Sequence, residues 1–101
     1  MTVPGAVVDF AQRSVRRDDG SEEVLSVQET DLVRLLAERR DRAVPREELL
    51  SLLWRTSAPD LGSRAVDMLV ARVRSKLGDA GREPRALLTV RGCGYRLVVE
   101  S

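Results

Sequence analysis

The stretch from residue 63 to residue 77, SRAVDMLVARVRSKL, constrains the fold of this chain most. At about 100° per residue, one side of a helix over this stretch is apolar and carries Val66, Val70, Val73 and Leu77. The opposite side has two arginines and no carboxylate, and it carries Arg64, Met68, Ala71, Arg72 and Ser75. The apolar side of such a helix packs on a core. The other side either enters a polyanionic groove or simply keeps the helix in solution.

The distribution of charge along the chain favours the polyanionic groove. Residues 1–63 hold nine arginines and twelve carboxylates, a net charge of −3. Residues 64–96 hold eight cations and three carboxylates, a net charge of +5, although the whole chain carries only +1. A basic C-terminal third is typical of a surface that binds a polyanion.

Length and composition predict one domain and exclude several classes of function. A chain of 101 residues with 43% apolar residues is long enough for one real core. With one cysteine and no histidine, neither an internal disulfide nor a transition-metal site is expected, which suits a reducing cytoplasm. There is no glycine-rich phosphate loop, no nucleophile with a neighbouring base, no signal peptide and no apolar run that could cross a bilayer. We therefore expect a cytoplasmic protein that is not an enzyme and has no cofactor and no membrane partner.

The N-terminal half of the chain predicts a small sheet followed by a helix. Short β-rich runs occupy residues 6–25, and the Asp-Gly pair at 19–20 is a strong turn signal. Ser26 and Glu29 form a capping box, which predicts a helix over 26–38. The arginines that follow suit the negative end of a helix dipole better than a second polyanion site.

The second half predicts two further helices and a hairpin. Pro45 is expected at the first position of a helix over 45–54, where its missing N–H costs little. Residues 55–63 form a loop of small residues, and the helix over 63–77 follows it. Two β-rich runs joined by a tight glycine-containing turn then predict a hairpin over 87–99.

The tip of this hairpin carries the sequence RGCG. Gly92 and Gly94 allow the backbone to turn sharply and to approach another molecule closely. Cys93 is expected to be an incidental exposed thiol. Tyr95 is expected to pack within the hairpin.

Five motifs in the chain are more specific than the order of its elements: L-S-x-x-E, R-E-E-L-L-x-x-x-W, R-x-V-D, R-x-R-x-K-L-G-D and T-V-R-G-x-G-Y-R. Together, from about Leu25 to Leu97, they resemble the OmpR/PhoB family, the DNA-binding effector domains of two-component response regulators. The resemblance implies an α+β fold: a winged helix-turn-helix with an N-terminal antiparallel sheet, three helices and a C-terminal β-hairpin wing. The single domain over 1–101 then divides into the sheet at 6–25, a helical core at 26–78 and the wing at 87–99.

The resemblance also implies a function, a sequence-specific DNA-binding domain of a bacterial-type transcriptional regulator. The helix over 63–77 would lie in the major groove of double-stranded DNA and the wing over 87–99 at the minor groove. The loop over 55–63 would contact RNA polymerase, and two copies would pair on DNA. The implied DNA-binding residues are Arg46, Trp54, Arg64, Met68, Arg72, Arg74, Thr89 and Arg91. Asp67 matches a motif position too, but its charge makes an intramolecular salt bridge the expected role.

Four positions depart from the family pattern. Thr30 stands where an aromatic residue is usual, so the first helix is expected to lose a core anchor, and Pro45 replaces a serine cap. Leu69 and Ala71 stand where a polar residue and an arginine are common, and both are expected to thin the DNA face. These two positions support an alternative, a protein-interaction module on the same fold. The receiver domain that usually precedes this domain is not part of the sequence, so the sequence is either an excised domain or a stand-alone or atypical regulator.

Overall fold

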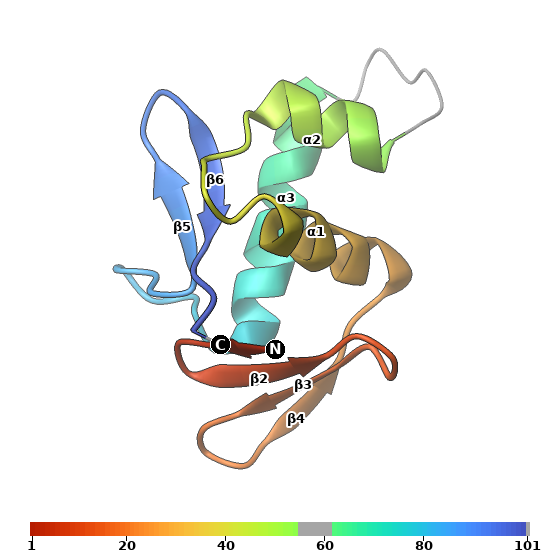
Figure 1. The fold of residues 1–101 in the computed structure, drawn as a ribbon, viewed down its shortest axis with the longest axis vertical. Coiled ribbons are helices and arrows are strands. Elements are labelled where there is room, and N and C mark those ends of the chain that lie inside the picture. The colour runs from red at the N-terminus through yellow and green to blue at the C-terminus, as the bar shows by residue number, and fades with distance from the viewer. Residues whose placement is uncertain (55–61, 101) are drawn as a thin grey trace.

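A computed structural model of the chain describes residues 1–54 and 62–100. In this part of the chain, a four-stranded sheet is followed by three helices and a two-stranded hairpin, as predicted for an α+β winged helix (Figure 1). The elements are β1 (Thr2–Val3), β2 (Ala6–Asp9), β3 (Ser14–Arg17), β4 (Glu22–Val24), α1 (Val27–Glu38), α2 (Arg46–Leu53), α3 (Gly62–Leu77), β5 (Leu87–Val90) and β6 (Gly94–Leu97).

The N-terminal sheet is antiparallel throughout, with strand order β1-β2-β3-β4. Val8 faces Val15 in the register, and both are fully buried, whereas Val7 is exposed on the other side. The sheet begins earlier than the predicted residue 6, because β1 is a two-residue strand that is too short to show alternation. The N–H of Glu100 donates to the Thr2 carbonyl oxygen at 2.7 Å, so the C-terminal end of the chain lies against β1 (Figure 1).

The capping box at the start of α1 is confirmed. The Glu29 N–H donates to Ser26 Oγ at 3.1 Å, and the Ser26 N–H donates to Glu29 Oε1 at 2.7 Å. Thr30 is buried, and its hydroxyl donates to the Ser26 carbonyl oxygen at 2.8 Å. This bond satisfies the one polar group that a threonine adds where an apolar anchor is usual.

Helix α2 begins one residue later than predicted. Pro45 is the N-cap and not the first helical residue, because its ψ of 151° is extended. Its carbonyl oxygen still accepts the first helical bond, from the Leu49 N–H at 3.1 Å.

Glu48 accepts two hydrogen bonds from Arg42, at 3.1 and 2.6 Å, and also pairs with Arg39. The arginines after α1 therefore fasten α1 to α2.

Helix α3 runs through the middle of the molecule, between the sheet at one end and α2 at the other (Figure 1). Its predicted apolar side is buried, and so is Leu69, which is 0% exposed. The expectation that Leu69 thins the DNA face is therefore wrong. At about 100° per residue, Leu69 lies about 60° from Val66, on the flank of the apolar stripe. The core is completed by the inward-facing residues of the sheet, by Leu32, Val33, Leu36 and Leu49 of α1 and α2, and by Leu87 and Leu97 of the wing.

The wing pairs β5 with β6 and packs beside α3. Its backbone also meets the segment between α1 and α2, where Val44 and Tyr95 exchange two backbone hydrogen bonds at 2.7 and 3.0 Å. Gly94 has a φ of +146°, and a Cβ on it would lie 2.0 Å from the Val44 carbonyl oxygen. The close approach expected at Gly94 is therefore made to the chain itself and not to another molecule. At Gly92, an added Cβ would meet nothing within 4 Å.

Candidate nucleic-acid interface

The outer side of α3 is an exposed stripe without a carboxylate. Its members are Arg64, Met68, Ala71, Arg72 and Ser75, the five residues predicted for that side. Met68 is 56% exposed, which confirms that it is not core filler. The two-sided character predicted for this helix is confirmed, because its other side forms the centre of the core.

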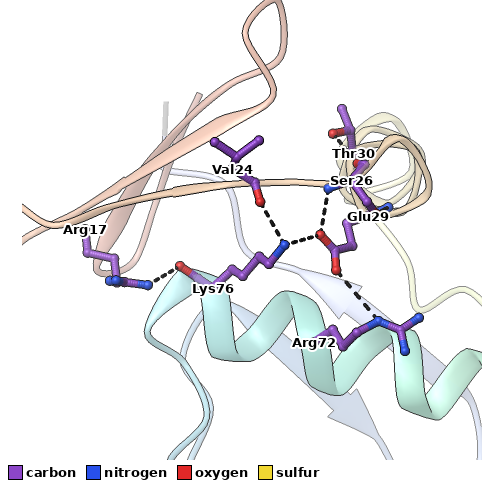
Figure 2. Close-up of polar contacts among 7 residues, drawn as sticks. All are labelled: Arg17, Val24, Ser26, Glu29, Thr30, Arg72 and Lys76. Atoms are coloured by element: carbon purple, nitrogen blue, oxygen red, sulfur yellow. Dashed lines mark hydrogen bonds and ion pairs between the residues drawn. The ribbon is translucent and has the colours of Figure 1, made fainter.

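Among the five residues of the stripe, only Arg72 has a described contact with a carboxylate on another element. Its Nε lies 3.7 Å from Oε2 of Glu29 on α1, while half of its side chain stays exposed (Figure 2). Lys76, one turn further along α3, donates from Nζ to Glu29 Oε1 and to the Val24 carbonyl oxygen, both at 2.8 Å. Burial raises the pKa of Glu29, but the hydrogen bonds from Lys76 and from the Ser26 N–H outweigh it, and the pKa lies below its ordinary value.

A second carboxylate, Asp67, joins α3 to α2 and the wing. Its Oδ1 accepts from Arg46 Nε at 2.8 Å and from the Tyr95 hydroxyl at 2.6 Å. The predicted intramolecular role of Asp67 is confirmed. Tyr95 is buried, as expected of a packing residue, and its pKa is raised by burial and by its hydrogen bond to Asp67. The guanidinium groups of Arg46 and Arg74 lie 5.7 and 5.6 Å from the centre of its ring.

Arg74 and Thr89, both predicted to bind DNA, contact each other. Arg74 donates from Nε and Nη2 to the Leu87 carbonyl oxygen, at 2.9 and 2.8 Å, and from Nη2 to Thr89 Oγ1 at 2.8 Å. Arg74 is also only partly exposed. These bonds hold β5 against α3, so the positions of the wing and of the helix depend on each other.

A cleft of about 380 Å³ separates the wing tip from the start of α2. Three of the predicted residues line it together: Arg46, Thr89 and Arg91. Trp54 does not join them. It is half-buried and lines a different groove, between α1 and α2, with Leu35, Leu53 and several charged residues.

Two buried carboxylates near this surface were not predicted as part of it. Glu29 was recognised only as a cap, although two cations one turn apart, Arg72 and Lys76, would have been a signal for an acidic partner. Asp79 accepts three backbone N–H groups at the start of β5, those of Arg85, Ala86 and Leu87, at 2.7 to 3.1 Å. Its only sequence signal is its place in the K-L-G-D motif.

Over the described residues, no cluster of histidine, cysteine or acidic side chains could hold a metal ion, and no helix is long and apolar enough to cross a membrane.

The family described as "Transcriptional regulatory protein, C terminal" matches residues 20–97. The chain belongs to this family. Its relatives include the transcriptional regulatory protein PcoR of Escherichia coli, which is 36% identical over 98 residues. That match covers 97% of this chain but 42% of PcoR, so the chain spans less than half the length of this relative. The chain is thus an OmpR/PhoB-type effector domain, as its motifs indicated.

Solved structures of the family have the same fold. The response regulator DrrB of Thermotoga maritima, described as an OmpR/PhoB homologue, superimposes with a TM-score of 0.78 and 27% identity, over 94% of this chain and 42% of DrrB. The DNA-binding domain of Klebsiella pneumoniae RstA, solved in complex with the RstA box, gives a TM-score of 0.74 and 30% identity. That match covers 96% of this chain and 94% of the RstA chain. The RstA domain was therefore solved on its own DNA site.

Proposed function

We propose that this chain is a sequence-specific DNA-binding domain of a transcriptional regulator of the response-regulator type. The α3 stripe enters the major groove of double-stranded DNA, and the wing tip with Arg91 reaches the minor groove or its phosphates. The base-facing residues are Arg64, Met68 and Arg72. Arg46 contacts phosphate from the start of α2 and Trp54 from the residue after its end, apart from Arg46, and Arg74 and Thr89 act at the junction of helix and wing.

The observation that carries this proposal is the exposed stripe of α3, which has two arginines, no carboxylate and a fully buried opposite side. A helix that enters a groove lined by phosphates must not desolvate a negative charge there. Arginine is also the side chain that pairs bidentately with guanine O6 and N7. The RstA domain in complex with its DNA box is a precedent on the same fold.

The alternative, a protein-interaction module with a decayed DNA face, loses one of its two supports. Leu69 is buried, so its apolar side chain takes nothing from the exposed stripe. Ala71 remains, because it is exposed on the stripe and lacks the reach of an arginine. The stripe then retains Arg64 and Arg72 as its base-reading cations.

Further partners belong to the same proposal. The loop over 55–63 contacts RNA polymerase; most of it, residues 55–61, lies outside the described residues. Two copies pair on adjacent half-sites of DNA. The domain works in the cytoplasm, where its single exposed thiol, Cys93, stays reduced.

A selection experiment with two salt concentrations tests the proposal. Random duplexes are enriched on the 101-residue chain, and the enriched duplex is compared in gel shifts with an unselected one and with the promoter nearest the chain's own reading frame. Specific binding should exceed binding to the unselected duplex at both salt concentrations, and both should weaken as salt rises. Equal affinity for all duplexes would refute sequence-specific binding, and no binding to any duplex would favour the interaction module.

A further inference from the structure

We propose that Glu29 is a positioning residue that holds Arg72 in the orientation in which it reads a base. The inference rests on the proposed DNA-binding function and adds a residue that never touches DNA. Glu29 lies on α1 and is 4% exposed in its side chain, so it belongs to the interior and not to the DNA face.

The two oxygens of Glu29 have different partners. Oε1 accepts from the Ser26 N–H at 2.7 Å and from Lys76 Nζ at 2.8 Å, so two short bonds fix the carboxylate (Figure 2). Oε2 is then directed at Arg72, whose Nε lies 3.7 Å away. A carboxylate held by the cap of one helix and a lysine of another cannot follow Arg72 if that side chain swings.

This contact occupies one edge of the guanidinium group and leaves another available. The ion pair faces the Nε edge, and among the described residues no protein acceptor bonds the two terminal nitrogens of Arg72. Those two nitrogens form the end of the fork that matches guanine O6 and N7. An arginine whose Nε edge is already paired with a fixed carboxylate loses less side-chain freedom when it binds, and this improves binding at the base that it reads.

The negative charge of Glu29 has the opposite effect on DNA binding that is independent of base sequence, because it weakens that binding. A carboxylate near the groove repels phosphate, so its removal should leave such binding equal or slightly stronger. A positioning role is therefore visible as a loss of discrimination and not as a general loss of affinity.

The test is a double-mutant cycle on DNA, with variants Glu29→Gln, Arg72→Ala and both together. Glutamine keeps the capping bond from the Ser26 N–H and the shape of the side chain, and removes the charge. Binding is measured to the selected duplex and to versions with each guanine replaced. Arg72→Ala should abolish discrimination at the base pair that Arg72 reads, by about 5- to 150-fold. Glu29→Gln should lower discrimination there by about three- to ten-fold, and by less than Arg72→Ala does, and it should change nothing once Arg72 is alanine.

Two controls separate positioning from charge and from stability. Asp31→Asn removes an exposed carboxylate from the same helix without touching Arg72, and its discrimination should equal that of the parent. Lys76→Gln removes the other cation of Glu29 together with its bond to the Val24 carbonyl oxygen, and thermal unfolding of this variant measures what these Lys76 contacts contribute to folding while Arg72 stays in place.

The outcomes distinguish this inference from the function on which it rests. If the parent enriches no sequence, both fail. If the parent discriminates and Glu29→Gln discriminates equally well, or if the effect of Glu29→Gln persists without Arg72, only the positioning role is refuted. Sharper discrimination by Glu29→Gln would mean that Glu29 withholds Arg72 from DNA, and this too overturns the proposal.

Discussion

Arg91 stands at the exposed tip of the wing, where it is free to meet the minor groove of DNA. This groove distinguishes base pairs poorly but has a strong negative potential. Replacement by alanine should therefore weaken binding to most sequences alike and lower the slope of log K against log salt by about one. Arg16→Ala is the matched control, because it removes an exposed charge of the same kind from the sheet. Titrations at several salt concentrations measure both slopes. An unchanged slope for Arg91→Ala would place the wing tip away from phosphate.

Glu29 gives the domain a stability that depends on pH. Its pKa in the folded chain lies below the ordinary value of 4.5, because the bonds from Lys76 and Ser26 outweigh the effect of burial. Between the two values the unfolded chain binds more protons, so this contribution is complete above about pH 4.5 and is lost as pH falls through the folded pKa.

The corresponding measurement compares the parent with Glu29→Gln in urea unfolding across a range of pH. We expect the parent to be the more stable at neutral pH, and the difference to shrink as the solution is acidified below pH 4.5. A difference that stays constant down to the acid transition would show that the charge of Glu29 is not what stabilises the fold.

At the scale of elements, one contact of the wing is a close approach of two backbones, between Gly94 and the segment before α2. Gly94→Ala would set a Cβ 2.0 Å from the Val44 carbonyl oxygen, at a φ of +146°. Neither atom can move away by a side-chain rotation, so the bridge between Val44 and Tyr95 should break. Gly92→Ala also has a positive φ, +78°, but its added Cβ would meet nothing within 4 Å, and it should cost only about 1–3 kcal/mol of backbone strain.

Denaturant unfolding of the two alanine variants checks this difference. Gly94→Ala should be the less stable variant by at least about 1 kcal/mol, because a clash and two lost hydrogen bonds add to the strain. Equal stability would mean that the segment before α2 can shift away from the wing at little cost.

The elements themselves could be predicted where their signals are local. The capping box at Ser26 marks the start of α1, and the period of α3 marks its two sides, because both follow from the geometry of one helix. The sequence could not predict the bridge between Val44 and Tyr95, which joins residues 51 positions apart in the chain. It also misassigned Leu69, because a position at the edge of an apolar stripe becomes core or surface according to the neighbour that packs on it.

The candidate site divides in the same way, into residues that the local sequence predicts and residues that only the fold brings together. The five exposed residues of the α3 stripe follow from period alone. The partners of Glu29, Asp67 and Arg74 lie on other elements, and only the fold brings them within hydrogen-bonding distance. The residues that face outward were therefore predictable, and so was the intramolecular role of Asp67, whereas the partners on other elements were not.

As a whole, the molecule measures 40 × 27 × 23 Å and presents one α3 stripe and one wing tip. These two surfaces can contact one half-site only, since neighbouring half-sites lie about 34–36 Å apart on one side of the duplex. The exposed large apolar side chains of the described residues are Val7, Val24, Val27, Leu52 and Met68, and each lies on a different element. No single element of the described residues therefore exposes a row of large apolar side chains of the kind that a stable dimer buries.

We therefore expect the chain to be a monomer in sedimentation at micromolar concentration, with weak binding to a duplex that carries one half-site. A duplex with two half-sites one helical turn apart should bind two copies more tightly, because each brings the other into contact on the same face. A spacing changed by about five base pairs puts the half-sites on opposite faces and should remove this gain. A tight dimer without DNA would contradict the prediction. Equal binding at both spacings would mean that the two copies act independently, and that a further segment or partner must supply the pairing in the full regulator.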